Sequence, residues 1–200
     1  MVKPVDFFFD FSSPYAYLAA MRIEALVRRY DRELAWRPML LGVVFKAVGG
    51  APLTEYGFKG PYSVRDFARS ARYAGLRYRM PEPFPIATQN AARLVLAVTR
   101  DLPEHAGDLV RAIFPAFFVD NRNINDPAVL GDICDGLGLD TARLLKAIEE
   151  PAIKDALRAN CEEALRRGVF GAPFMFVDDE PFWGNDRLPQ LEHWLKTGGF

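Results

Sequence analysis

The chain has few of the residues on which redox and metal chemistry depend. Its 200 residues include two cysteines and two histidines. Cys134 and Cys161 lie far apart, and the absence of a Cys-x-x-Cys pair excludes the usual disulfide-exchange motif and favours two buried, reduced thiols. His105 and His193 have no carboxylate or cysteine at ligand spacing, so we expect no metal site.

Charge of one sign and long apolar runs are also lacking. The formal net charge is −1, which gives no reason to expect nucleic acid or an anionic membrane as a partner. No apolar run reaches the length of a membrane span, and the N-terminus lacks a signal-like segment, so we expect a cytoplasmic protein. Half of the residues are hydrophobic, which is ample for a packed core.

The most informative segment is 7–18, where an apolar strand runs into the start of a helix. Ser13 occupies the N-cap position and Pro14 the first helical position, where its missing N–H costs nothing. A helix N-terminus presents unpaired N–H groups and a partial positive charge, which stabilise an anion. Thioredoxin-like proteins place their reactive cysteine at this turn. Here Ser13 either donates a hydrogen bond to a thiolate brought by a ligand such as glutathione, or serves only as a helix cap.

The rest of the chain divides into a strand, a helical block and a hairpin. Periodicity predicts a helix over 16–30, a second strand over 34–41 and a glycine-rich loop to residue 60. A nearly all-helical block follows, with helices near 61–75, 88–101, 103–119, 126–137, 140–149 and 151–167. After Gly168 we expect strands at 173–177 and 182–183 around a tight turn, and then a last helix over 187–196.

This order of elements predicts the fold. Two parallel strands need a crossover helix, which the first strand–helix–strand unit supplies. The sequence therefore predicts an α/β protein with a thioredoxin-like four-stranded sheet, interrupted by a large all-helical insertion. We expect residues 1–42 and 169–200 to form the discontinuous sheet domain and residues 43–168 to form the insertion.

Ala172 and Pro173 form the second candidate feature. Proline cannot donate to a sheet ladder, yet Pro173 directly precedes an apolar strand. A cis Ala172–Pro173 bond explains this position and would expose the N–H and C=O of Ala172 to a ligand.

Asn185 and Asp186, after Trp183 and Gly184, form the third feature. One interpretation is that Asn185 or Asp186 only caps the last helix. The other is that they bind an amino acid group. Asp186 would then accept from an α-ammonium, while Asn185 and the helix start donate to an α-carboxylate. The γ-glutamyl end of glutathione has both groups.

In this order, these features resemble those of the 2-hydroxychromene-2-carboxylate isomerases, in the group that includes the kappa-class glutathione transferases. The resemblance covers essentially the whole chain and is carried by residues 10–15, 42–69, 169–173 and 183–188. It implies a homodimer, glutathione as cofactor and a small aromatic carboxylate as substrate. The thiolate of bound glutathione would add to an activated double bond, the resulting single bond would rotate, and the thiol would be expelled.

The resemblance also implies the site residues. Ser13 is the catalytic residue, at the glutathione sulfur. The cofactor-binding residues are Ser13, Lys59, Ala172, Pro173, Trp183, Asn185 and Asp186. Phe45, Lys46 and Thr88 fall where the family has substrate contacts, and Gly50 replaces an asparagine that the family often carries.

Two alternatives remain beside the glutathione-dependent isomerase. One is a kappa-like glutathione transferase or thiol–disulfide enzyme of the same fold. Consumption of glutathione would indicate transfer, and the missing Cys-x-x-Cys argues against disulfide exchange. The other is a non-catalytic protein that binds glutathione or a peptide, with Ser13 as a cap alone.

Overall fold

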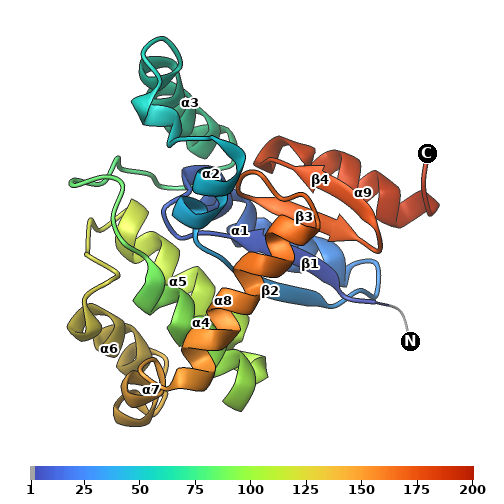
Figure 1. Cartoon of the computed structure of the whole chain (residues 1–200). Helices are drawn as coiled ribbons and strands as arrows, with labels where there is room; N and C mark the ends of the chain where they lie inside the picture. Colours follow the sequence, from blue (N-terminus) through green and yellow to red (C-terminus); the bar gives the residue numbers. More distant parts are fainter. Residues whose placement is uncertain (1–2) are drawn as a thin grey trace.

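The computed structural model describes residues 3–200, and these form a mixed four-stranded sheet of order β2-β1-β3-β4 (Figure 1). The strands are β1 (Val5–Phe9), β2 (Leu34–Pro38), β3 (Phe174–Val177) and β4 (Glu180–Trp183). β1 pairs in parallel with β2 and antiparallel with β3, and β3 pairs antiparallel with β4. The predicted thioredoxin-like sheet is therefore confirmed.

Helix α1 (Pro14–Arg28) connects β1 to β2, and a long helical block separates β2 from β3. The block contains α2 (Leu41–Val48), α3 (Lys59–Tyr73), α4 (Gln89–Asp101), α5 (Ala106–Phe118), α6 (Pro127–Gly136), α7 (Thr141–Ala147) and α8 (Pro151–Arg166). Helix α9 (Leu188–Thr197) follows β4, and short 3₁₀ turns occupy Leu53–Glu55, Pro103–His105 and Asn185–Arg187. This arrangement confirms the predicted helical insertion.

Helix α2 corrects the prediction of a strand to residue 41 followed by a loop. The strand ends at Pro38, and Leu41–Val48 is helical, burying Leu41 and Val44. Gly49 ends the helix in the left-handed region, at φ 71°. Valine and phenylalanine have high strand propensity, so local preference misleads here, and burial of one helical face against the protein decides the conformation.

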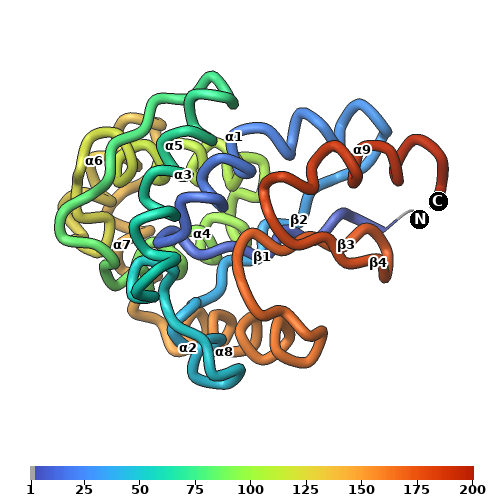
Figure 2. Tube along the Cα trace, turned by 90° about the horizontal axis from the view of Figure 1, so that it is seen from above, coloured from blue at the N-terminus to red at the C-terminus, as the bar shows by residue number. Residues whose placement is uncertain are grey.

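The sheet is covered on both faces, with α1 and α9 on one side and α8 on the other (Figure 2). Phe7 and Phe9 pack in the cluster that contains α1, whereas Phe8 packs in a second cluster with Leu157 and Cys161 of α8. Successive residues of a strand point to opposite faces, so the apolar run of β1 serves both layers. The division into a sheet domain and an insertion at residues 42 and 169 stays a prediction. Helix α8 lies inside the expected insertion, yet it covers one face of the sheet. Cys134 and Cys161 are both buried and free, as expected.

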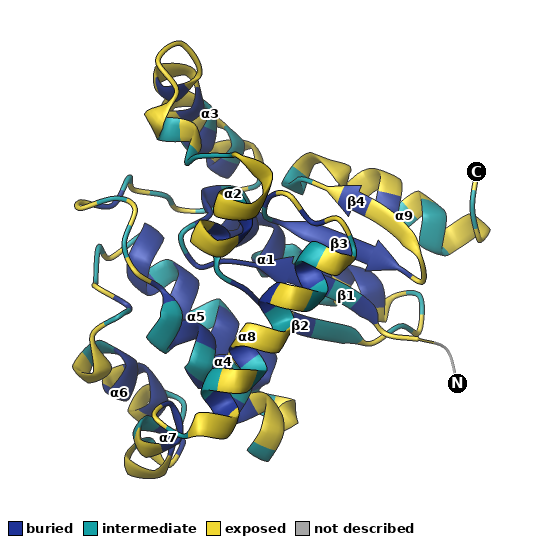
Figure 3. Ribbon diagram, viewed as in Figure 1, coloured by how far each residue is buried: buried dark blue, intermediate teal, exposed yellow. Residues whose placement is uncertain are grey.

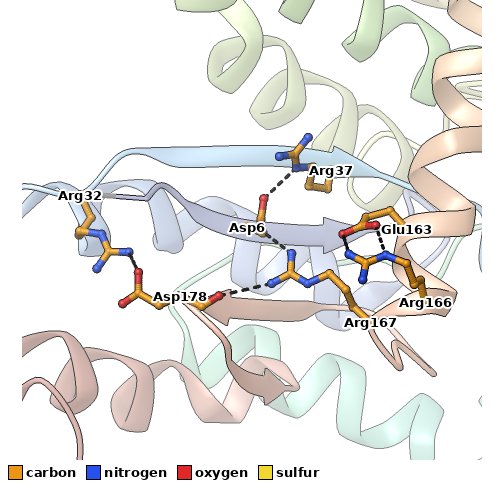
Figure 4. Close-up of polar contacts among 7 residues, drawn as sticks. All are labelled: Asp6, Arg32, Arg37, Glu163, Arg166, Arg167 and Asp178. Carbon is orange, nitrogen blue, oxygen red and sulfur yellow. Dashed lines mark hydrogen bonds and ion pairs between the residues drawn. The ribbon is translucent and has the colours of Figure 1, made fainter. Parts of the chain in front are cut away.

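A polar cluster ties the end of α8 to the sheet (Figure 4). Arg167 Nη1 lies 2.6 Å from Asp6 Oδ2, and Arg37 Nε lies 2.8 Å from Asp6 Oδ1. The Arg167 guanidinium also lies 3.6 Å from the centroid of the Phe176 ring. These contacts anchor the chain just before it enters segment 168–173, which reaches the candidate site.

Helix α3 projects from the body of the molecule, and much of its surface is exposed (Figures 1 and 3). Phe58, Tyr62 and Tyr73 are exposed on or next to it. Between residues 3 and 200, no helix is long and apolar enough to cross a membrane.

Candidate active site

A pocket of about 710 Å³ opens at the N-terminus of α1. This volume lies in the range of about 300–1,000 Å³ that is typical of sites for small organic ligands. Its apolar wall includes Leu41, Phe45, Tyr56, Phe67, Phe84, Phe170 and Trp183. Its polar lining includes Ser12, Ser13, Tyr15, Lys59, Asp66, Asn185, Asp186 and Arg187. Five separate parts of the sequence therefore meet at one cavity.

Ser13 is the N-cap of α1, as predicted, and its side chain spans two parts of the site. Its Oγ accepts from Ala16 N at 3.1 Å and donates to the carbonyl oxygen of Ala172 at 2.9 Å. A hydroxyl has one proton, and rotation about the Cβ–Oγ bond can redirect it from Ala172 toward a ligand. Pro14 has no N–H and the Ala16 N–H is capped, so the Tyr15 N–H is left without a partner among the described residues.

Ala172 lies next to Ser13 at the wall of the pocket. The Ala172–Pro173 bond is cis, as the sequence predicts. The Ala172 carbonyl is not free, however, since it accepts the Ser13 hydroxyl. Pro173 itself is buried and does not line the pocket.

Trp183 forms an aromatic pair at the pocket wall. Its ring lies 4.7 Å from that of Phe170, centroid to centroid, in an edge-on arrangement. A Cβ at Gly171 would come within 2.7 Å of Trp183 Nε1, so only glycine leaves room for the indole here. Gly171 thus allows the 168–173 segment and β4 to form one continuous wall.

Asn185 and Asp186 both line the pocket, but the expected capping role is wrong. The N-cap of α9 is Arg187, and no side-chain bond caps that helix. Asn185 Oδ1 instead accepts from Arg22 Nη2 of α1, and Asp186 Oδ2 lies 3.1 Å from Arg187 Nη1. The Arg22 bond orients the Asn185 side chain, which leaves its NH₂ group available to a ligand.

The remaining sequence candidates divide into two groups. Phe45 and Lys59 line the pocket, and so does Gly50. Lys46 is exposed on α2, and Thr88 is buried with its hydroxyl donating to Asp10 Oδ1 at 2.9 Å; neither lines the pocket. A Cβ at Gly50 would lie 3.0 Å from Phe45 Cδ1, so the phenylalanine occupies space that a side chain at position 50 would need.

Tyr15 and Asp66 form a pocket pair that the sequence reasoning missed. The Tyr15 hydroxyl donates to Asp66 Oδ2 at 2.5 Å, and Arg69 and Ser70 donate to the same carboxylate. Burial raises the pKa of Asp66, but the hydrogen bonds from Tyr15 and Arg69 outweigh it and hold this pKa below its usual value. Burial and the neighbouring Asp66 raise the pKa of Tyr15. The pair therefore consists of a neutral phenol and a carboxylate, and it joins α1 to α3.

The replacement Tyr15→Phe is expected to lower the free energy of unfolding by about 1.5 kcal/mol at neutral pH, because a hydrogen bond to a charged group is lost. A carboxyl whose pKa is depressed on folding stabilises the protein above its unfolded-state pKa, and this contribution disappears as the pH falls through the folded-state value. The difference between parent and variant should therefore shrink in acid. Urea unfolding of both proteins across the acidic range measures it, and a difference that does not change with pH would contradict the role of ionised Asp66.

Comparisons with known proteins agree with this geometry. The DsbA-like thioredoxin domain family matches residues 4–196. A 2-hydroxychromene-2-carboxylate isomerase of Sphingobium xenophagum is 34% identical over 200 residues, which cover 98% of this chain and 99% of the relative. Glutathione S-transferase kappa 2 of Caenorhabditis elegans is 27% identical, with 96% and 92% of the two chains covered.

A solved structure supports the same relationship. The structure of a 2-hydroxychromene-2-carboxylate isomerase superposes with a TM-score of 0.85 at 27% identity and covers 96% of this chain and 94% of its own. The similarity in sequence and the superposition both extend over nearly the whole chain, and the family match at residues 4–196 includes every residue that lines the pocket. This chain therefore belongs to the DsbA-like thioredoxin domain family and, within it, to the 2-hydroxychromene-2-carboxylate isomerases.

Proposed function

We propose that this protein is a glutathione-dependent isomerase of an aromatic-catabolism intermediate, with glutathione as a cofactor that is regenerated in each turnover. The observation that carries the proposal is the Ser13 hydroxyl, which lies at the start of α1, lines the pocket and contacts the Ala172 carbonyl at 2.9 Å. The isomerase relative at 34% identity supports the reaction class. The kappa glutathione transferase relative supports the cofactor.

The residues of the pocket fit the groups of glutathione. A γ-glutamyl end carries one ammonium and one carboxylate, and Asp186 and the Asn185 NH₂ group are suited to accept from the first and donate to the second. The Ala172 backbone would hold the cysteinyl part. Lys59 would hold a carboxylate of glutathione, since its ammonium belongs to no ion pair within residues 3–200. The ammonium lies 5.5 Å from the centroid of the Tyr56 ring, which also lines the pocket.

The reaction depends on a stabilised thiolate and an apolar space beside it. Bound glutathione would supply a thiol that adds reversibly to an activated double bond, so that rotation becomes possible before the thiol leaves. The Ser13 hydroxyl, the Tyr15 N–H and the partial positive charge of the α1 N-terminus would hold negative charge at the sulfur and lower the pKa of the thiol. Leu41, Phe45 and Phe84 would bind the aromatic ring and exclude water.

An assay of cofactor use tests the proposal. A bicyclic aromatic carboxylate of the kind that the relatives' name describes should isomerise only when glutathione is present, and the glutathione concentration should be unchanged after many turnovers. Loss of glutathione in proportion to product would indicate the transferase alternative. Calorimetric binding of glutathione without turnover of any unsaturated aromatic acid would indicate a non-catalytic binding protein. We also expect a homodimer in the cytoplasm, and light scattering of the purified protein tests its oligomeric state.

A further inference from the structure

Asp10 is a buried carboxylate directly after β1, three residues before Ser13. It is 4% exposed, and no ion pair within residues 3–200 includes it. A buried charge without a cation is costly unless hydrogen bonds compensate for the lost water. The function proposed above gives Asp10 no task.

Three donors from three different segments bind this carboxylate. Ser12 N donates to Oδ1 at 2.8 Å, Thr88 Oγ1 donates to Oδ1 at 2.9 Å, and Leu41 N donates to Oδ2 at 2.6 Å. Leu41 is the first residue of α2, whose own N-cap makes no side-chain bond, so Asp10 caps this helix from another part of the chain. The partial positive charge at the N-terminus of α2 also favours the carboxylate.

The three donors belong to, or adjoin, segments that supply different lining residues of the pocket. Ser12 precedes Ser13 at the polar side, where the thiol would lie. Leu41 starts the helix that carries Phe45, and Thr88 ends the segment that begins with Phe84, both on the apolar side. We propose that Asp10 is a positioning residue that holds the thiol side of the pocket in register with its apolar, substrate-binding side. The names of the two sides rest on the proposed function, whereas the contacts do not.

The chemistry of the three donors explains why a carboxylate stands here. Two of the donors are backbone N–H groups, which can only donate, and they bind different oxygens of Asp10. In Asp10→Asn one of these N–H groups would face the NH₂ group of the amide, whichever way the amide is turned. Burial raises the pKa of Asp10, and the hydrogen bonds from Ser12, Leu41 and Thr88 oppose this effect. The sequence predicted Thr88 as a substrate contact. On this proposal Thr88 affects substrate binding indirectly, through its hydrogen bond to Asp10.

The first test uses Thr88→Val, which removes one donor and keeps the shape of the side chain. We expect the KM for the aromatic substrate to rise about fivefold, because one net hydrogen bond no longer holds the Phe84 segment. The Kd of glutathione and the pKa of its bound thiol should change less than about twofold, since the Ser12 and Leu41 bonds remain. Thr88→Ser should restore the parent KM.

The matched control is Thr141→Val. Thr141 also donates from its hydroxyl to a carboxylate, that of Asp135, but lies outside the pocket. This variant should leave both KM values unchanged. If Thr88→Val changes the substrate KM no more than Thr141→Val does, or Thr88→Ser fails to restore it, Thr88 and Asp10 support only the fold and the proposal is wrong.

The second test needs no glutathione. Amide hydrogen exchange, followed by NMR in the ligand-free protein, should be at least about tenfold faster at Ser12 or Leu41 in Asp10→Asn than in the parent. If that variant does not fold, faster exchange at Ala92, whose N–H donates to the Thr88 carbonyl oxygen at 2.9 Å, in Thr88→Val replaces this measurement. Unchanged exchange in the folded variants would overturn the proposal. Failure of the parent to bind glutathione would instead overturn the proposed function, while the exchange rates would still decide the role of Asp10.

Discussion

Replacing Ser13 by alanine is expected to reduce turnover about 100-fold, the size of effect seen when one donor to a developing negative charge is removed from an active site. The fold should persist, since losing a helix cap costs about 1 kcal/mol. Two hydrogen bonds disappear in the variant, one from Ala16 N and one to the Ala172 carbonyl. The larger consequence is chemical, because a thiolate beside residue 13 would keep only the helix terminus and the Tyr15 N–H as partners.

Two measurements separate these consequences for Ser13→Ala. Steady-state kinetics gives the loss of turnover, and the ultraviolet absorbance of the thiolate as a function of pH gives the pKa of bound glutathione. That pKa should rise in the variant. Ser12→Ala is the matched control, because the Ser12 side chain neighbours Ser13 at the pocket but does not cap α1. An active Ser13→Ala protein with an unchanged thiol pKa would refute the assigned role.

Replacing Asp186 by alanine is expected to raise the KM for glutathione at least about tenfold, through loss of a charged hydrogen bond to the ligand's ammonium. The rate at saturating glutathione should change little. The γ-glutamyl end is remote from the reacting sulfur, so its contacts stabilise ground state and transition state alike. Arg187, which pairs with Asp186 at 3.1 Å, would lose its partner and could not replace the carboxylate.

Asp179→Ala provides the charge-matched control for Asp186→Ala. Asp179 is an exposed carboxylate in the turn between β3 and β4 and does not line the pocket. Its replacement alters the net charge by the same amount and should leave the KM for glutathione unchanged. A reduced saturated rate in Asp186→Ala with normal glutathione affinity would place this residue at the reaction itself and contradict the assignment to the γ-glutamyl end.

Features that depend on neighbouring residues were predictable. Ser13 and Pro14 form a helix start because the cap oxygen and the fixed proline φ act within one turn, and the structure has both at these positions. The apolar runs at β1 and β3 predicted strands, and parallel pairing of β1 with β2 followed from the intervening helix. The helical block followed in the same way from apolar periodicity and helix breakers.

Features that depend on distant residues were not predictable. Nothing within residues 41–48 caps α2, and the acceptor that does so is Asp10, which lies in the turn between β1 and α1. One interpretation of the sequence had Asn185 or Asp186 capping α9, but no side chain caps that helix, and the Asn185 oxygen accepts from Arg22 on another helix. Tyr15 and Asp66 are 51 positions apart and show no motif in the sequence.

The sequence by itself determined the helix start at Ser13 and the order of the elements apart from α2, because short-range sterics, capping and apolar periodicity are encoded within a few residues. Only the tertiary structure decided which polar groups satisfy one another. A buried donor or acceptor must find a partner in the space around it, and that partner comes from any part of the chain that folding brings near. Thr88 illustrates the difference, since its buried hydroxyl binds Asp10 and does not line the pocket.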